Sequence, residues 1–235
     1  MRLKNKVAVI TGASRGIGKS IAEYYAAEGA RLVISARDTG RLGAVRDELK
    51  SRGTEVISVT ADVSKESDVV TLVKAAMEAF GRIDILVNNA GFGIFKPVVE
   101  MKTEEFDSLF NVNMRGTFIA TRETLPHMIA EKDGVIINIA SLAGKNAVEN
   151  GAAYAATKWA VLGFARSLML EVRKHNIRVV TICPGSVDTD FGSGNRPNRD
   201  KILKPADVAE AAVLAASLPA TAMMSEIDLR PTNPK

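Results

Sequence analysis

Residues 7–18 read VAVITGASRGIG, an apolar run followed by three closely spaced glycines. Its first five residues are apolar or β-branched, which is typical of a strand buried on both faces of a sheet. Gly12, Gly16 and Gly18 then permit a tight turn, a close approach of the backbone to a pyrophosphate, and packing of a helix on the strand. The trio alone would also fit a simple turn, but a strand before it and a helix after it favour a dinucleotide-binding unit.

The same alternation of strand and helix continues along the chain. Short runs rich in Val and Ile predict strands at 6–11, 31–36, 55–60, 84–88, 134–140, 177–183 and 223–229. Helices are expected near 16–28, 41–52, 66–80, 103–128, 152–174 and 205–217. This order predicts an α/β protein with a single-domain Rossmann fold, a doubly wound parallel sheet of about seven strands flanked by helices.

The length of 235 residues suits one domain over 1–235, without a linker or a repeat. We expect a cofactor half at roughly 1–130 and a catalytic and substrate half at roughly 131–235. The least regular segment is 185–204, rich in Gly, Pro, Asn and Asp. Because long loops in compact domains are often functional, residues 190–204 predict a short lid.

Composition argues against several function classes. A net charge of +4 is mild and its basic residues are spread along the chain, so no nucleic-acid partner is expected. The single Cys183 excludes an intramolecular disulfide and suits a reducing compartment. No signal-peptide core or membrane-length apolar run is present, which predicts a cytoplasmic protein without a membrane partner. His127 and His175 stand alone, so no metal is expected.

Four motifs together carry a family resemblance. TGASRGIG (11–18), NNAG (88–91), YAATK (154–158) and PGSVDT (184–189) resemble the short-chain dehydrogenase/reductase family, in family order and over essentially the whole chain. The resemblance implies an oxidoreductase that uses a nicotinamide cofactor and acts on CH–OH groups. The cofactor-binding positions it implies are Gly12, Ser14, Arg15, Gly16, Ile17, Gly18, Arg37, Asp62, Val63, Asn89, Ala90, Gly91, Tyr154, Lys158, Pro184, Gly185, Val187 and Thr189.

The end of the second strand, RLVISARDTGR (31–41), bears on the choice between NAD and NADP. NAD-preferring relatives carry an acid where this chain has Ala36, whereas Arg37 falls where NADP-preferring relatives carry a base. Arg15 is a second such base, and two guanidiniums suit a ribose 2′-phosphate. Asp38 would then cap the helix that begins near Arg41. We therefore predict NADP(H); the alternative is that both arginines are merely solvated.

The resemblance also implies a catalytic set of Asn113, Ser141, Tyr154 and Lys158. Tyr154 would donate the proton that a reduced carbonyl oxygen needs, and Lys158, one helical turn on, would lower the pKa of the tyrosine from about 10. Ser141 would orient the carbonyl, and Asn113 would hold a water that leads protons to the lysine. Asn111 is a nearby residue that could be confused with Asn113.

We expect an NADPH-dependent carbonyl reductase or alcohol dehydrogenase acting on a small apolar ketone or aldehyde. The small or apolar residues predicted to line the pocket are Phe92, Ile94, Phe95, Ala143, Gly144, Ala147 and Val148, with Lys145 and Glu149 as nearby charges. Two alternatives stay open: a 3-oxoacyl-thioester reductase, which the tail SEIDLRPTNPK disfavours, and a non-catalytic NADPH-binding regulator. The long helices near 103–128 and 152–174 predict a homodimer or homotetramer, because the second is more apolar than one face against the sheet requires. Trp159 on that helix is interpreted as a packing or interface residue rather than a substrate platform.

Overall fold

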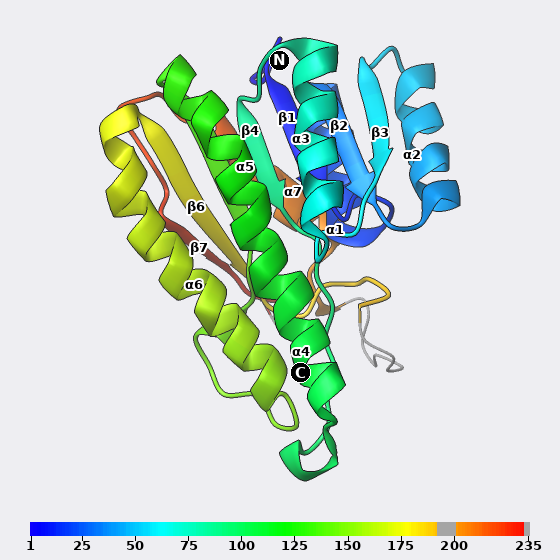
Figure 1. The fold of residues 1–235 in the computed structure, drawn as a ribbon, viewed down its shortest axis with the longest axis vertical. Helices are drawn as coiled ribbons and strands as arrows, with labels where there is room; N and C mark the ends of the chain where they lie inside the picture. Colours follow the sequence, from blue (N-terminus) through cyan, green and yellow to red (C-terminus); the bar gives the residue numbers. More distant parts are fainter. Residues whose placement is uncertain (192–200, 233–235) are drawn as a thin grey trace.

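A computed structural model describes residues 1–191 and 201–232 of the chain. Seven parallel strands form one sheet in the order β3-β2-β1-β4-β5-β6-β7 (Figure 1). The strands are β1 (Val7–Thr11), β2 (Arg31–Ala36), β3 (Val56–Thr60), β4 (Ile85–Asn88), β5 (Gly134–Ile139), β6 (Ile177–Pro184) and β7 (Glu226–Leu229). Each lies within one residue of a predicted strand or inside it, and the predicted Rossmann fold is confirmed.

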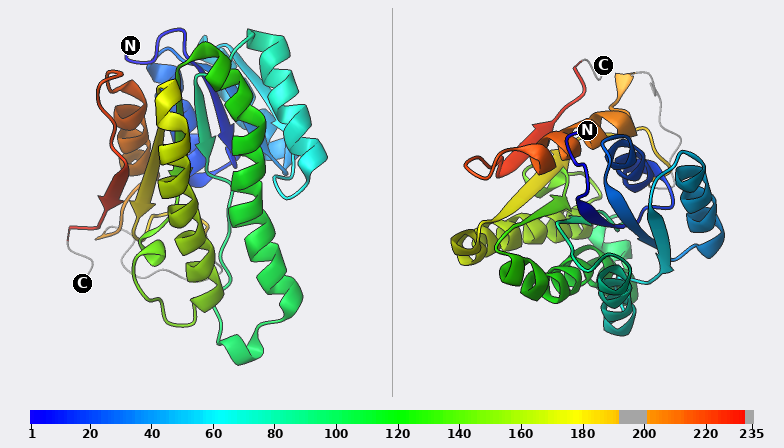
Figure 2. Two further views of the ribbon diagram at one scale, coloured as in Figure 1. Left: turned by 60° about the vertical axis from the view of Figure 1, so that its left-hand side comes forward. Right: turned by 90° about the horizontal axis from the view of Figure 1, so that it is seen from above.

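Helices cover both faces of the sheet (Figure 2). On one face pack α1 (Gly16–Ala27), α2 (Thr39–Ser51) and α7 (Pro205–Ser217). On the other face pack α3 (Glu66–Phe80), α5 (Gly116–Glu131) and α6 (Ala152–Val172). Alternate strand residues serve the two layers: Ile10 joins the first core and Val9 the second. This division explains why the strands read as continuous apolar runs.

One predicted helix is divided in the structure. The segment expected at 103–128 forms α4 (Thr103–Phe110), a π-helical turn η2 (Asn111–Arg115) and then α5, which continues to Glu131. A π turn inserts one residue into the helical repeat and shifts the apolar pattern that follows it, and so small a shift is not recognised in a sequence read as one continuous helix. Such turns often lie at functional sites, and this one contains Asn113.

The sheet order places a crossover between β1 and β4, where the chain leaves on opposite sides of the sheet. The carboxyl ends of parallel strands meet at one edge, and ligands bind there in doubly wound folds. Gly12, Asn89 and Pro184 stand at or just after the ends of β1, β4 and β6. Within residues 1–191 and 201–232, no helix has the length and apolar composition needed to cross a membrane.

Candidate active site

The turn after β1 requires glycine at three positions for different reasons. Gly12 and Gly16 have left-handed backbones, with φ of 67° and 56°. A Cβ on Gly12 would also lie 2.8 Å from the Cα of Ala90. Gly18 has no unusual backbone, but a Cβ there would overlap the Gly12 carbonyl and the Asn89 amide. Gly18 therefore brings α1 against the turn, as the sequence predicts.

Thr11 and Asn89 join this turn to the end of β4. The Thr11 hydroxyl donates to the Val87 carbonyl at 3.2 Å and accepts from the backbone N–H groups of Asn89 and Ala90, both at 3.1 Å. The Asn89 side chain donates to the carbonyls of Thr11 (2.9 Å) and Gly12 (3.1 Å). Sequence reasoning missed Thr11; its signal was a hydroxyl at the end of an otherwise apolar strand.

These strand ends surround a cavity of about 900 Å³. Every residue predicted for cofactor binding or catalysis lines it except Gly18 and Asn113. The predicted residues that line it are Gly12, Ser14, Arg15, Gly16, Ile17, Arg37, Asp62, Val63, Asn89, Ala90, Gly91, Ser141, Tyr154, Lys158, Pro184, Gly185, Val187 and Thr189. The glycine turn and the Tyr–Lys pair therefore share one cavity, although they are about 140 residues apart in sequence.

At the end of the cavity beside β2, Arg37 and Asp38 have different surroundings. Asp38 Oδ1 accepts a hydrogen bond from the Arg41 backbone N–H at 3.0 Å and caps α2, which begins at Thr39 rather than near Arg41. Arg37 is exposed and lines the cavity, and in the described part of the chain no hydrogen bond or ion pair holds its guanidinium. Ala36 is buried and carries no carboxylate.

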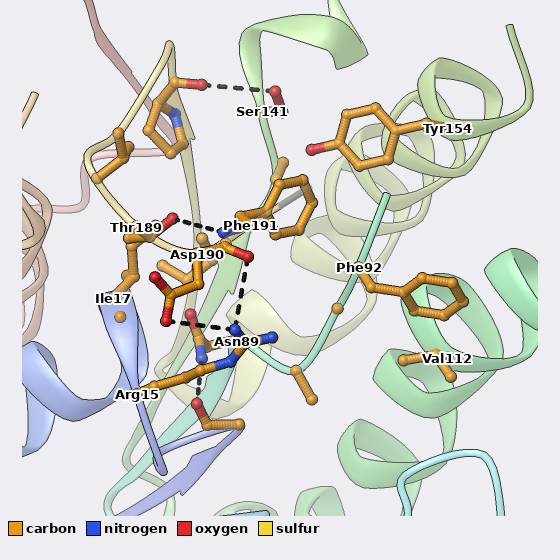
Figure 3. A pocket seen from close by; sticks show the side chains of 18 of the residues that line it. Arg15, Ile17, Asn89, Phe92, Val112, Ser141, Tyr154, Thr189, Asp190 and Phe191 are labelled. Atoms are coloured by element: carbon orange, nitrogen blue, oxygen red, sulfur yellow. Dashed lines mark hydrogen bonds and ion pairs between the residues drawn. The ribbon is translucent and has the colours of Figure 1, made fainter. Parts of the chain in front are cut away.

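Two further side chains shape the same end. Arg15 Nη1 lies 3.5 Å from Asp190 Oδ2, an exposed ion pair across the cavity (Figure 3). Asp62 accepts hydrogen bonds from the Ser64 backbone N–H (3.0 Å) and hydroxyl (2.7 Å). Burial alone would raise the pKa of Asp62, but these bonds keep it below its usual range. The carboxylate is therefore ionised at neutral pH.

At the opposite end of the cavity, Tyr154 and Lys158 lie one helical turn apart on α6 and both are buried. Lys158 Nζ donates to the Ile139 carbonyl at 3.0 Å and lies 5.9 Å from the centroid of the Tyr154 ring. Burial lowers the pKa of Lys158 from 10.5 to about 8. In Figure 3 the Tyr154 hydroxyl points into the cavity, toward the side where Ser141 lies.

Ser141 begins the short 3-10 helix η3 (Leu142–Gly144). Its hydroxyl accepts from the Ala143 backbone N–H at 3.1 Å and donates to the Pro184 carbonyl at 3.5 Å. A Cβ on Gly144 would lie 2.9 Å from the Lys158 carbonyl, so the absence of a side chain lets this turn sit directly on α6. The close packing brings Ser141 to the same end of the cavity as Tyr154.

Asn113 lies just outside the cavity and joins three segments. Its Oδ1 accepts from the Phe92 backbone N–H (3.0 Å), and its Nδ2 donates to the Phe92 carbonyl (2.9 Å) and to the Thr157 hydroxyl (3.0 Å). A Cβ on Gly91 would lie 3.1 Å from Asn113 Oδ1 and 3.7 Å from Lys158 Nζ, so both groups border the same glycine. Asn111, the alternative in the sequence, is exposed.

The substrate end of the cavity is mostly apolar. Of the residues predicted to line it, Phe92, Phe95, Ala143 and Val148 do, whereas Ile94, Gly144 and Ala147 do not. Leu142, Ser186, Asp190 and Phe191 line it and were not predicted. Phe191 had a possible signal, since it is the one aromatic residue in the polar segment 185–204.

Lys145, predicted as a charge near the pocket, is directed elsewhere. Its Nζ lies 2.7 Å from both Glu226 Oε2 and Asp228 Oδ1 of β7, and Arg166 Nε of α6 reaches Glu226 Oε1 at 2.6 Å. Hydrogen bonds from Arg166 and Lys145 lower the pKa of Glu226 to about 2. This network ties the turn after Ser141 to the last strand, and neither Lys145 nor Glu149 lines the cavity.

The start of the predicted lid borders the cavity. Of the predicted lid at 190–204, residues 192–200 lie outside the described residues, and Asp190 and Phe191 at its start line the cavity. In the parts of the chain that are described, no three His, Cys, Asp or Glu side chains are grouped so that they could hold a metal ion.

Comparison with known proteins gives a family match. The model of the short chain dehydrogenase family matches residues 6–200. An uncharacterized oxidoreductase of Staphylococcus saprophyticus is 38% identical over 232 residues, covering 98% of this chain and 99% of its own length. One from Staphylococcus aureus is 36% identical over 229 residues, covering 97% and 98% of the two chains.

Solved structures are similar over the same length. A metagenomic short-chain oxidoreductase in complex with NADP has a TM-score of 0.88 and 41% identity, covering 99% of this chain and 100% of its own. The alcohol dehydrogenase of Thermococcus sibiricus, complexed with 5-hydroxy-NADP, has a TM-score of 0.91 and 35% identity, covering 97% of both chains. A 3-ketoacyl-(acyl-carrier-protein) reductase from Brucella melitensis, complexed with NADH, has a TM-score of 0.90 and 37% identity, covering 96% and 97%.

Proposed function

The chain belongs to the short-chain dehydrogenase/reductase family and is an NADP-dependent oxidoreductase, and we propose that it acts as a carbonyl reductase on small apolar ketones and aldehydes. The observation that carries the proposal is the buried Tyr154–Lys158 pair, which shares one cavity with Ser141 and the glycine turn. In the reverse direction the enzyme would oxidise the corresponding alcohols.

The cavity suits a dinucleotide at the end where phosphates would lie. The turn around Gly12 leaves no room for a side chain, and no hydrogen bond or ion pair within the described residues holds the Arg37 guanidinium. Arg37 and Arg15 would hold a ribose 2′-phosphate by charge-assisted hydrogen bonds, and Asp62 and Val63 would meet the adenine. Pro184, Gly185, Val187 and Thr189 would hold the nicotinamide end, which supplies or accepts a hydride when the cofactor is bound.

The catalytic residues divide the remaining work. In reduction, Tyr154 gives its hydroxyl proton to the carbonyl oxygen as negative charge develops there. The Ser141 hydroxyl donates a hydrogen bond to the same oxygen and fixes its direction. The Lys158 ammonium stabilises the tyrosinate that remains. Asn113 has a positioning role, because its hydrogen bonds to Phe92 and Thr157 hold the segments on either side of Lys158.

The substrate class can be tested by NADPH oxidation, followed by absorbance, against ketones, aldehydes, diketones and acetoacetyl thioesters. Turnover of simple apolar carbonyl compounds supports the proposal. Preferred turnover of the thioester would support a 3-oxoacyl-thioester reductase, a candidate favoured by the similarity to the Brucella melitensis enzyme. Tight NADPH binding without turnover of any compound would favour a non-catalytic regulator instead.

Arg37→Ala is expected to raise the KM for NADPH about 10- to 100-fold and to leave the KM for NADH almost unchanged. The change removes hydrogen bonds between a guanidinium and a phosphate, and NADH lacks that phosphate. Initial rates with both cofactors measure the effect. Arg52→Ala, at the exposed C-terminal end of α2 and outside the cavity, is the matched control. An equal rise for both cofactors would contradict the assignment of Arg37.

We also propose that the chain forms a homodimer or homotetramer through α4, α5 and α6. Phe106, Phe118, Trp159 and Leu170 are large apolar residues exposed on these helices. Light scattering at micromolar concentration is expected to give two or four times the chain mass of 25.1 kDa. A mass of one chain would contradict this proposal. The lone buried Cys183 supports a further proposal, a cytoplasmic location.

A further inference from the structure

Three aromatic rings meet at the substrate end of the cavity. The Phe95 ring, after β4, lies 5.1 Å from the ring of Tyr154, and the Phe191 ring, after β6, lies 5.7 Å from it. Both pairs are tilted by 57°. A Cβ on Gly93 would lie 2.7 Å from the Phe95 ring and 3.0 Å from the Phe191 ring, so both phenyl rings reach the same glycine. We call Phe95, Tyr154 and Phe191 the aromatic cluster.

The cluster is not an extension of the apolar core. Phe95 is 45% exposed although its ring contacts Tyr154, and it belongs to neither core layer of the sheet. A phenyl ring that serves stability alone is normally buried, since burial is what makes it stabilising. Phe95 and Phe191 both line the cavity, and Figure 3 shows the Phe191 ring beside the Tyr154 hydroxyl.

Apart from Lys158 and Asp190, the side chains around the cluster are mostly apolar. Phe92, Leu142, Ala143 and Val148 complete this end of the cavity. Lys145 is held by Glu226 and Asp228, away from it.

The cations that line the cavity are engaged or distant. Arg15 pairs with Asp190, and Arg37 and Arg41 follow β2, which β1 and β4 separate from β5. Lys158 donates to the Ile139 carbonyl. Among the described lining residues, this end therefore offers apolar and aromatic surface and no uncommitted cation for a carboxylate or phosphate.

We infer that the enzyme selects aryl ketones and aryl aldehydes, whose ring packs edge-to-face on Phe95 and Phe191 while the carbonyl oxygen reaches Tyr154 and Ser141. Tilted ring pairs are the favoured geometry for aromatic groups, and the cluster already shows that tilt. Tyr154 is itself one of the three rings. When the substrate's aryl ring packs on the cluster, the carbonyl group bonded directly to that aryl ring lies beside the Tyr154 hydroxyl. The inference rests on the proposed reductase function.

The test compares methyl phenyl ketone with methyl cyclohexyl ketone, which have the same carbon skeleton and differ in aromaticity. The measured quantity is the ratio of their kcat/KM values with NADPH. Phe95→Leu and Phe191→Leu are each expected to lower this ratio about fivefold, and the double variant more, because leucine keeps an apolar contact but loses the ring pair. Phe95→Tyr keeps a ring and should preserve the ratio. Phe80→Leu, on α3 and outside the cavity, is the matched control.

Binding is measured separately, by saturation-transfer NMR of methyl phenyl ketone on the enzyme with NADP⁺ present. Normal turnover with an unchanged ratio in the leucine variants would overturn the aryl inference and leave the reductase function standing. Absence of turnover for every carbonyl compound, with ring binding that weakens in Phe95→Leu, would refute the reductase and support an aryl site. If neither turnover nor binding of the aryl ketone is detected, the reductase function and the aryl site are both refuted. Thermal denaturation confirms that each variant is folded. Phe95→Met, which also replaces the ring by an apolar chain and should lower the ratio, is used if Phe95→Leu does not fold.

Discussion

Tyr154→Phe is expected to lower kcat for carbonyl reduction about 10²- to 10⁴-fold, the range associated with loss of a positioned general acid. The ring stays in place, so its contacts with Phe95 and Phe191 remain, and only the hydroxyl directed into the cavity is lost. NADPH affinity should stay close to that of the wild-type protein, because no proposed contact to the phosphates or the adenine involves this hydroxyl.

Single-turnover rates and NADPH fluorescence titration measure the two effects separately. Tyr24→Phe is the matched control, since Tyr24 lies on α1, packs against the core and does not line the cavity. A variant that keeps more than about a tenth of the wild-type kcat would mean that another group delivers the proton.

Lys158→Met is expected to abolish most turnover and, at pH 7, to raise the free energy of unfolding by roughly 1–3 kcal/mol. Burial lowers the pKa of Lys158 from 10.5 to about 8, so the folded chain holds the ammonium at a cost of about 3 kcal/mol. Methionine removes that cost. The hydrogen bond to the Ile139 carbonyl is also lost, which lowers the free energy of unfolding by about 1 kcal/mol.

The pH dependence of this gain follows from the direction of the pKa change. Between about pH 8 and pH 10.5 the unfolded wild-type chain binds more protons at this lysine than the folded chain. Wild-type stability at this site therefore rises with pH through that window, and the advantage of Lys158→Met should disappear by its upper end.

Urea unfolding of both proteins at pH 7 and pH 10 measures the difference, in which other titrating groups cancel. Lys174→Met, at an exposed lysine after α6, should change stability little at either pH. Two results would contradict this prediction: a lower free energy of unfolding for Lys158→Met at pH 7, or a stabilisation that is the same at both pH values. Either would show that burial of the Lys158 ammonium does not destabilise the folded chain.

The sequence predicted features that depend on local pattern. The sheet was readable because strands buried on both faces appear as continuous apolar runs between helices. Asp38 was predicted as a cap, and its hydrogen bond to the Arg41 backbone N–H confirms that role. The π turn around Asn113 was not predicted, since it is stabilised by contacts to Phe92 and Thr157 from other segments. Where the predicted site residues lie is now known; their roles stay predictions.

The aromatic cluster could not be assembled from the sequence for a related reason. Phe95 and Phe191 are 96 positions apart and meet only because β4 and β6 end at the same edge of the sheet. Phe191 also lies in a polar stretch, where an isolated aromatic residue gives no periodicity to interpret. The ion pairs of Lys145 could not be predicted either, because its carboxylate partners belong to the last strand, far from it in sequence.

The attachment of Lys145 to β7 matters for anyone who modifies this protein. β7 is at the edge of the sheet and mostly half-buried, yet Glu226 and Asp228 hold the turn that carries Ser141. A solid support or fusion partner joined at the C-terminus would pull on this strand first, and through it on the reaction centre. Attachment points on the outer surface of α2, such as Lys50, would transmit strain to neither.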